Sequence, residues 1–170
     1  MASNELFPIE REILQKLKEA SQRLNDETPR PEWTTAFKEA LTKLGEGRDL
    51  AVWGGIPCRA ESSEWLWDIT WADCPKDPKG RSNWRGLRQV VLACEIEWDP
   101  RDDWLLEDFL KLTVCNAAYR LFVFRQVAKR LQEQFDMLMA ACPGSRGYRY
   151  LAIAVPNTVG DELEYRAWTL

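Results

Sequence analysis

Histidine is absent from this 170-residue chain, and its absence narrows the chemistry that the protein can perform. Ser-His-Asp and Cys-His nucleophiles, histidine general bases and histidine-ligated metals are all excluded. Any hydrolytic reaction must therefore use carboxylates, lysine, or a hard metal ion held by oxygen atoms.

Cysteine is present in small number and without paired spacing. The five cysteines are far apart, odd in number and form no C-x-x-C motif; they are Cys58, Cys74, Cys94, Cys115 and Cys142. This pattern predicts reduced thiols that serve as small apolar side chains. A zinc site is not expected, because paired ligand spacing and histidine are both missing.

Long apolar runs and an excess of positive charge are missing as well. No segment is apolar for long enough to cross a bilayer, and the residues after Met1 do not form a basic stretch followed by an apolar one. We therefore expect no signal peptide, no membrane partner and a cytoplasmic location. The net charge of -4 provides no global field for DNA binding, although it permits a local basic groove.

The hydrophobic pattern predicts a single α/β domain spanning residues 1–170. The predicted helices are about 8–24, 32–44, 102–118 and 126–141, with Gly45 and Gly47 ending the second and Asp102 or Asp103 capping the third. The predicted strands are 50–53, 64–71, 88–98, 119–124, 148–155 and 163–169, and 56–60 is a further candidate. The N-terminal helices occupy 1–47, a core with the candidate site 50–124, and a helix with two strands 126–170.

The order of these elements predicts a mixed β-sheet flanked by helices on both faces. The first three strands follow one another without helices, which favours antiparallel pairing. The helix before residue 119 then permits a crossover to a parallel neighbour.

Carboxylates occur inside two of the most apolar strand segments. Glu95 and Glu97 share a strand face with Val91 and Ala93, and antiparallel pairing would bring Asp68 near them. Clustered carboxylates repel one another unless a divalent cation neutralises them. The pattern is compatible with a metal site, and a solvent-exposed strand face is the alternative.

A lysine lies on the helix that follows these acids. As an ordinary surface residue, Lys111 would pair with Asp108 or Glu107 along the helix. Alternatively, it reaches the carboxylates and supplies the positive charge that a phosphate needs.

Nine tryptophans are a large number for this length. Trp65, Trp67 and Trp71 are predicted to share one strand face in the core, the alternative being a platform for stacked bases. Trp84 lies in a connection with several basic residues, namely Lys76, Lys79, Arg81, Arg85 and Arg88. Such a loop suits either a nucleic-acid contact or a solvated connection.

Residues 53–124 resemble the PD-(D/E)XK, or restriction-endonuclease-like, nucleases, as in a small bacterial member of that superfamily. The resemblance implies an αβββαβ core and identifies Asp68 and Glu95 as paired metal-binding acids. Glu97 stands where the family usually has lysine, and Trp67 where a proline usually precedes the aspartate. Lys111 would then supply the missing lysine. A further acid from the first helices is implied in some members, with Glu10, Glu12 and Glu39 as candidates.

The activity implied by this resemblance is phosphodiester hydrolysis that depends on Mg²⁺ or Mn²⁺. Asp68, Glu95 and Glu97 would hold the metal, and Lys111 would orient water or stabilise negative charge. The alternative is a catalytically inactive nuclease fold that acts as a protein-interaction or regulatory module. Nucleic acid is the first expected partner, and a second copy of the chain or another protein remain open.

Overall fold

A computed structural model describes residues 5–24, 27–54, 66–76, 82–142, 147–158 and 161–170 of the chain. The helices are α1 (Pro8–Ser21), α2 (Arg30–Glu46), α3 (Asp102–Thr113) and α4 (Leu131–Ala140). The strands are β1 (Ala51–Trp53), β2 (Ile69–Asp73), β3 (Gln89–Glu97), β4 (Ala117–Arg125), β5 (Arg149–Val155) and β6 (Glu164–Thr169). Short 3-10 helices cover Trp84–Gly86 and Ala128–Arg130.

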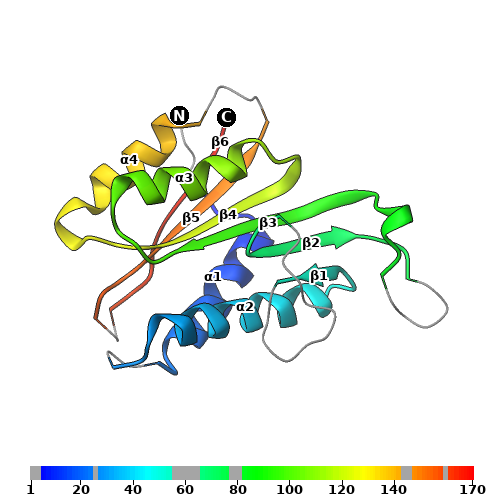
Figure 1. Cartoon of the computed structure of the whole chain (residues 1–170), viewed down its shortest axis with the longest axis horizontal. Coiled ribbons are helices and arrows are strands. Elements are labelled where there is room, and N and C mark those ends of the chain that lie inside the picture. Colours follow the sequence, from blue (N-terminus) through cyan, green and yellow to red (C-terminus); the bar gives the residue numbers. More distant parts are fainter. Residues whose placement is uncertain (1–4, 25–26, 55–65, 77–81, 143–146, 159–160) are drawn as a thin grey trace.

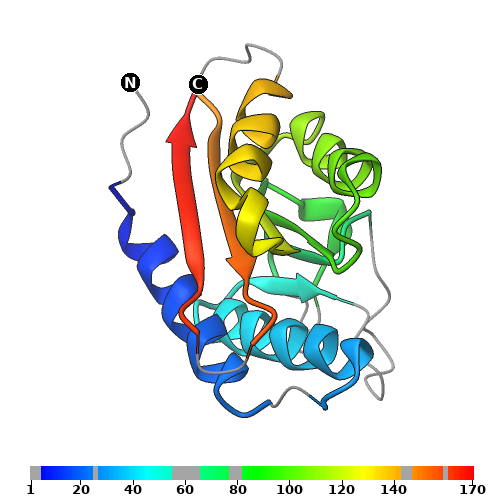
Figure 2. The same cartoon turned by 90° about the vertical axis from the view of Figure 1, so that its left-hand side faces the viewer.

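The strands form one mixed sheet in the order β1-β2-β3-β4-β5-β6. Strands β1, β2 and β3 are antiparallel, β3, β4 and β5 are parallel, and β6 is antiparallel to β5. Helices α3 and α4 make the two crossovers between parallel strands. Successive right-handed crossovers in one direction place both helices on the same face of the sheet. Figures 1 and 2 show α3 and α4 on one face, with α1 and α2 covering the other.

The alternation of side chains along the strands divides the core into two layers. On β3, Leu92, Cys94 and Ile96 belong to the layer beneath α1 and α2. Ala93 belongs to the layer that also contains Leu105 and Phe109 of α3. The predicted α/β class, with a mixed sheet and helices on both faces, is confirmed.

A glycine allows α2 to lie unusually close to the sheet. A Cβ atom added at Gly45 would be 2.7 Å from Val52 Cγ2 and 2.8 Å from Trp71 Nε1. The prediction that Gly45 ends the helix is wrong, because Gly45 lies inside α2. The helix continues to Glu46, and Gly47 is its C-cap. The close approach also carries the preceding turns of α2 toward the sheet.

A buried ion pair joins the N-terminal helix to the sheet. Glu10 of α1 accepts two hydrogen bonds from Arg149 of β5, each 2.7 Å long, and both residues are nearly inaccessible to solvent. The Arg149 guanidinium also lies over the Phe7 ring. Opposite charges and saturated hydrogen bonds are what permit two ionised side chains to be buried.

Two details of the predicted strands and helix caps are wrong. Strand β2 begins at Ile69, so Asp68 precedes the strand instead of lying inside it. Arg101 occupies the N-cap position of α3, and neither Asp102 nor Asp103 caps it, because both lie within the first turn.

The shared face predicted for three tryptophans is also wrong. Trp71 is buried beneath α1 and α2, whereas Trp67 packs against the layer beneath α3. Trp67 can turn to that side because it precedes the paired strand, and its Nε1 donates to Lys111 O at 3.3 Å. Trp65, together with the candidate strand 56–60, lies outside the described residues.

Candidate active site at the end of strand β3

Asp68 lies where the pairing between β2 and β3 ends. Ile69, the first residue of β2, lies opposite Cys94, and no residue before it is paired with β3. The Asp68 carboxylate then takes the place of a strand carbonyl, because Oδ2 accepts a hydrogen bond from Ile96 N at 2.8 Å. Asp68 is thus fixed beside the segment Glu95–Ile96, although no strand continues at this point.

Lys38 of α2 approaches Asp68 from the face of the sheet that α1 and α2 cover, and it forms an ion pair with the carboxylate. Its Nζ lies 2.8 Å from Asp68 Oδ1, and the lysine side chain is only 7% exposed. Burying an ammonium group without an anion would be costly, so the carboxylate and the lysine stabilise each other there. Both oxygens of Asp68 are therefore engaged.

Glu95 lies on the α3 face of β3 and is buried. Its Oε2 is 3.8 Å from Lys111 Nζ, and the lysine also contacts Asp108 Oδ1 at 2.5 Å. The predicted pairing of Lys111 with Asp108 is confirmed. The second expectation, that Lys111 reaches back toward the strand carboxylates, is met at Glu95.

The electrostatics of Lys111 connect the members of this site. The hydrogen bond to Asp108 raises its pKa most, burial lowers it by less than this, and the charges of Glu95, Asp108 and Asp68 raise it further. Lys111 is therefore a permanent cation at neutral pH. It is suited to holding an anion or stabilising negative charge, and unsuited to removing a proton from water.

Glu97 is two residues after Glu95 on β3, so its side chain points to the same face of the sheet. Burial raises its pKa, and a hydrogen bond with the Asp108 side chain raises it further. Its Oε1 also accepts a hydrogen bond from Asp99 N at 2.5 Å. Glu97 therefore belongs to the same group of acids, but its contacts are with Asp108 and the chain that follows β3.

The acids predicted on the first helices do not join this group. Glu10 is committed to Arg149, Glu12 pairs with Arg48 at 2.7 Å, and Glu39 lies 3.8 Å from Lys43. The side chain that α2 contributes to the site is instead Lys38, because adjacent residues on a helix point in directions about 100° apart. Glu39 consequently faces away from the sheet.

Lys38 is the residue that the sequence interpretation missed. A signal was present in its periodicity, because Lys38 shares a helical stripe with Leu41, Thr42 and Gly45, all of which are buried. A lysine in such a stripe needs an anion across the interface. Only the fold shows that this anion is Asp68.

The basic connection after β2 is described only in part. Lys76 contacts Asp49, and Arg88 lies 3.4 Å from Asp73, so both cations have acidic neighbours. Lys79, Arg81 and the side chain of Trp84 lie outside the described residues. The four described cysteines are free thiols, as predicted, and Cys58 is outside this part of the chain.

Carboxylate oxygens such as those at the end of β3 are the ligand type that hard divalent cations prefer. Among the residues that the structure describes, no three carboxylate or thiol side chains are grouped to enclose a metal. Mg²⁺, however, is typically bound through one or two carboxylates, with water and substrate phosphate completing its shell. Asp68 and Glu95, on adjacent segments, are the two carboxylates that could hold such a cation, which would have to displace Lys38 from Asp68.

Fold and geometry together define an α/β protein with a partly buried cluster of carboxylates and lysines at the carboxyl end of a central strand. No protein-family model, curated protein or solved structure matches the chain. Within its described parts, none of the helices combines the length and apolar character needed to span a bilayer.

Proposed function

We propose that this protein is a divalent-metal-dependent nuclease with a PD-(D/E)XK-type site. The observation that carries the proposal is the convergence of Asp68, Glu95 and Lys111, from three separate segments, at the end of β3. The succession α2, β1, β2, β3, α3, β4 also follows the αβββαβ order of that superfamily. Lys111 takes the part of the family lysine, which Glu97 replaces in the strand.

The chain's own residues would divide the work in the following way. Asp68 and Glu95 would hold Mg²⁺ or Mn²⁺, which polarises a phosphate and lowers the pKa of a bound water molecule. Lys111, held by Asp108 beside Glu95, would bind a nonbridging phosphate oxygen and stabilise the charge that develops on it. Glu97, whose pKa is raised by burial and by its hydrogen bond with Asp108, would lie beside this pair on the same face of β3.

The test is cleavage of end-labelled single- and double-stranded DNA and RNA, with Mn²⁺ or Mg²⁺ and with EDTA. We expect metal-dependent cleavage that Asp68→Asn and Glu95→Gln abolish. Lys111→Met should lower kcat by about 100- to 1,000-fold, the usual effect of removing one charge-stabilising group. Glu39→Gln is the matched control, because it alters a carboxylate next to Lys38 that faces away from the site.

Metal binding provides a second and independent measurement. Calorimetric titration with Mn²⁺ should give binding to the natural chain and to Glu39→Gln, and much weaker binding to Asp68→Asn. Equal binding by all three proteins, with circular dichroism showing each to be folded, would contradict the proposal. Cleavage that persists in Asp68→Asn and Glu95→Gln would contradict it as well.

A second function, a nuclease fold without catalysis that binds a protein partner, is favoured by one specific observation. Both oxygens of Asp68 are already engaged, by Lys38 and by Ile96 N. Under this alternative Lys38 permanently occupies the cation position, so the cluster is structural. Absence of both metal binding and cleavage in the natural chain would support this second function.

A further inference from the structure

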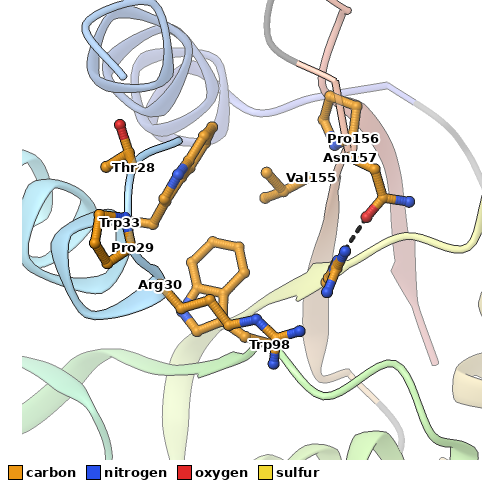
Figure 3. Close-up of a pocket in the computed structure, with 9 residues that line it drawn as sticks. Thr28, Pro29, Arg30, Trp33, Trp98, Val155, Pro156 and Asn157 are labelled. Atoms are coloured by element: carbon orange, nitrogen blue, oxygen red, sulfur yellow. Dashed lines mark hydrogen bonds between the residues drawn. The ribbon is translucent and has the colours of Figure 1, made fainter. Parts of the chain in front are cut away.

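A cleft opens at the carboxyl ends of the three parallel strands, on the other face of the sheet from Glu95 and Glu97. It has a volume of 310 Å³ and is drawn in Figure 3. Its lining residues are Thr28, Pro29, Arg30, Trp33, Trp98, Arg125, Val155, Pro156 and Asn157. Ligands of open α/β sheets bind preferentially at this edge, and the volume is at the lower end of the ~300–1,000 Å³ typical of small-molecule sites.

One side of the cleft is aromatic and held rigid from behind. The ring centroids of Trp33 and Trp98 are 6.0 Å apart, and both rings contact Phe37, which is fully buried. Trp98 Nε1 donates a hydrogen bond of 2.6 Å to Thr34 Oγ1, which fixes the orientation of the indole. Both tryptophans are only partly buried, so the cleft offers an ordered apolar surface to a planar ligand.

Two arginines supply the polar side of the cleft. Arg125 Nε donates to Asn157 Oδ1 at 2.5 Å, and Asn157 Nδ2 donates to Gln126 O, so this guanidinium is anchored by neutral groups. Within the described part of the chain, neither Arg30 nor Arg125 forms an ion pair, and the lining contains no carboxylate. Asp99, whose pKa is lowered chiefly by hydrogen bonds from Arg101 and least by Arg30, is held by Arg101.

We propose that this cleft binds one nucleotide unit, with the base against Trp33 and Trp98 and a phosphate between Arg30 and Arg125. Aromatic platforms beside cationic side chains are the recurrent means of binding unpaired bases, and arginine pairs well with phosphate oxygens. A neutral apolar ligand would leave the two guanidinium groups without an anion. The source of the unit is either a free nucleotide or an unpaired base of a single strand.

The cleft lies at the same end of β3 as the carboxylate cluster, so one extended ligand could reach both. Trp98 follows Glu97 directly, so the cleft and the carboxylate cluster lie on opposite faces at one end of β3. A single strand crossing this end would place one base on Trp98 and a neighbouring phosphate toward Lys111. This last step, the choice of single-stranded nucleic acid as substrate, rests on the proposed nuclease function, whereas nucleotide binding in the cleft does not.

The experiment measures binding without metal, so that it is independent of catalysis. Fluorescence anisotropy of fluorescein-labelled eight-nucleotide single strands is followed in EDTA, with AMP, dTMP, the unlabelled single strand and an unlabelled duplex as competitors. We expect saturable binding to the natural chain that the duplex does not displace. Displacement by mononucleotides identifies a free nucleotide as sufficient, and displacement by single strands alone identifies a polymeric ligand.

The decisive variants are Arg30→Gln/Arg125→Gln and Trp98→Leu. Loss of a stacking residue should weaken binding by about 5- to 100-fold. Loss of the two arginines should weaken binding and reduce the slope of log K against log salt by about 1 for each lost phosphate contact. Lys16→Gln/Lys43→Gln is the control of equal charge on the α1 and α2 surface, and its binding should change little.

Because Trp98 also packs in the core, the double arginine variant keeps the inference testable if Trp98→Leu fails to fold. Unchanged affinity and salt slope in the folded arginine variant would overturn the inference, as would absence of any binding to the natural chain. Failure of the nuclease proposal would appear differently, as binding in EDTA with no cleavage when metal is added.

Discussion

The Glu10–Arg149 pair and the cluster around Asp68 both place charged side chains against the same sheet, but the balance of positive and negative charge differs between them. Glu10 and Arg149 form a one-to-one pair with two short hydrogen bonds, and backbone and ring contacts surround it. At the end of β3, four carboxylates share two lysines; they are Asp68, Glu95, Glu97 and Asp108, with Lys38 and Lys111.

The comparison separates charge that serves the fold from charge that is suited to a ligand. A balanced pair gains nothing from an added ion, so Glu10 and Arg149 act as a structural link between α1 and β5. The β3 cluster contains more carboxylates than lysines, and burial together with the Asp108 side chain raises the pKa of Glu97. Clusters of this kind become more stable when a cation binds.

The largest expected effect is on the structural pair. Glu10→Gln leaves the Arg149 guanidinium buried without its anion and should lower the free energy of unfolding by about 3–5 kcal/mol. Urea denaturation followed by circular dichroism measures it. Glu12→Gln, which removes an exposed partner of Arg48, should change stability by at most ~1 kcal/mol. Equal effects of the two substitutions would show that Glu10 and Arg149 are not a structural link.

A smaller effect is expected from Lys38→Met, which removes the ammonium group from Asp68. Asp68 remains partly exposed and keeps its bond to Ile96 N, so the loss should be about 1–3 kcal/mol. Millimolar Mn²⁺ should then stabilise Lys38→Met more than the natural chain, because the cation no longer competes with the lysine. Thermal melts with and without Mn²⁺ test this. Identical metal-induced shifts would place Asp68 outside any metal site.

The third prediction concerns pH, and it follows from the raised pKa of Glu97. The folded state binds this proton more tightly than the unfolded state, so the associated stabilisation is complete below the ordinary pKa of 4.5 and is lost as pH rises through the raised value. The stability of the natural chain relative to Glu97→Gln should therefore fall as pH increases from 4.5 upward. Urea midpoints of both proteins across this range measure it, and a pH-independent difference would contradict it.

The smallest effect is expected at Trp67, whose Nε1 donates to Lys111 O. Trp67→Phe removes one hydrogen bond at a half-buried position and should reduce stability by about 0.5–1.5 kcal/mol. Lys111 should keep its place, since Asp108 holds its ammonium group. Cleavage and Mn²⁺ binding in this variant should match those of the natural chain, and a large loss of either would make Trp67 a positioning residue.

The sequence allowed much of the fold to be predicted, because its elements are strongly periodic. The order of helices and strands, the mixed sheet and its two covered faces all follow from local patterns and connection lengths. The strand pattern places the beginning of β2 too early, because the apolar composition before Ile69 suits a strand although pairing stops there. The same pattern places Trp67 on the wrong face, because Trp67 precedes the paired strand.

The candidate site was predictable in part. Strand alternation, helix position and the family resemblance single out Asp68, Glu95 and Lys111; the structure places Lys111 3.8 Å from Glu95 and Asp68 beside Ile96 N. The same patterns do not single out Lys38, because its partner lies 30 residues further along the chain and across a layer of the fold. The sequence does not predict the cleft, since Trp33, Trp98 and Arg125 come from three segments that are far apart in the chain.

The sequence by itself determined the class of structure and the available chemistry, because hydrophobic period and residue types are local properties. The lack of histidine removes histidine as a base, nucleophile or metal ligand from this chain, whatever the fold. Tertiary structure alone decided which charges meet. Strand pairing ended at Ile69 and Gly45 let α2 approach the sheet, so that Lys38 and Lys111 reach the carboxylates from opposite faces.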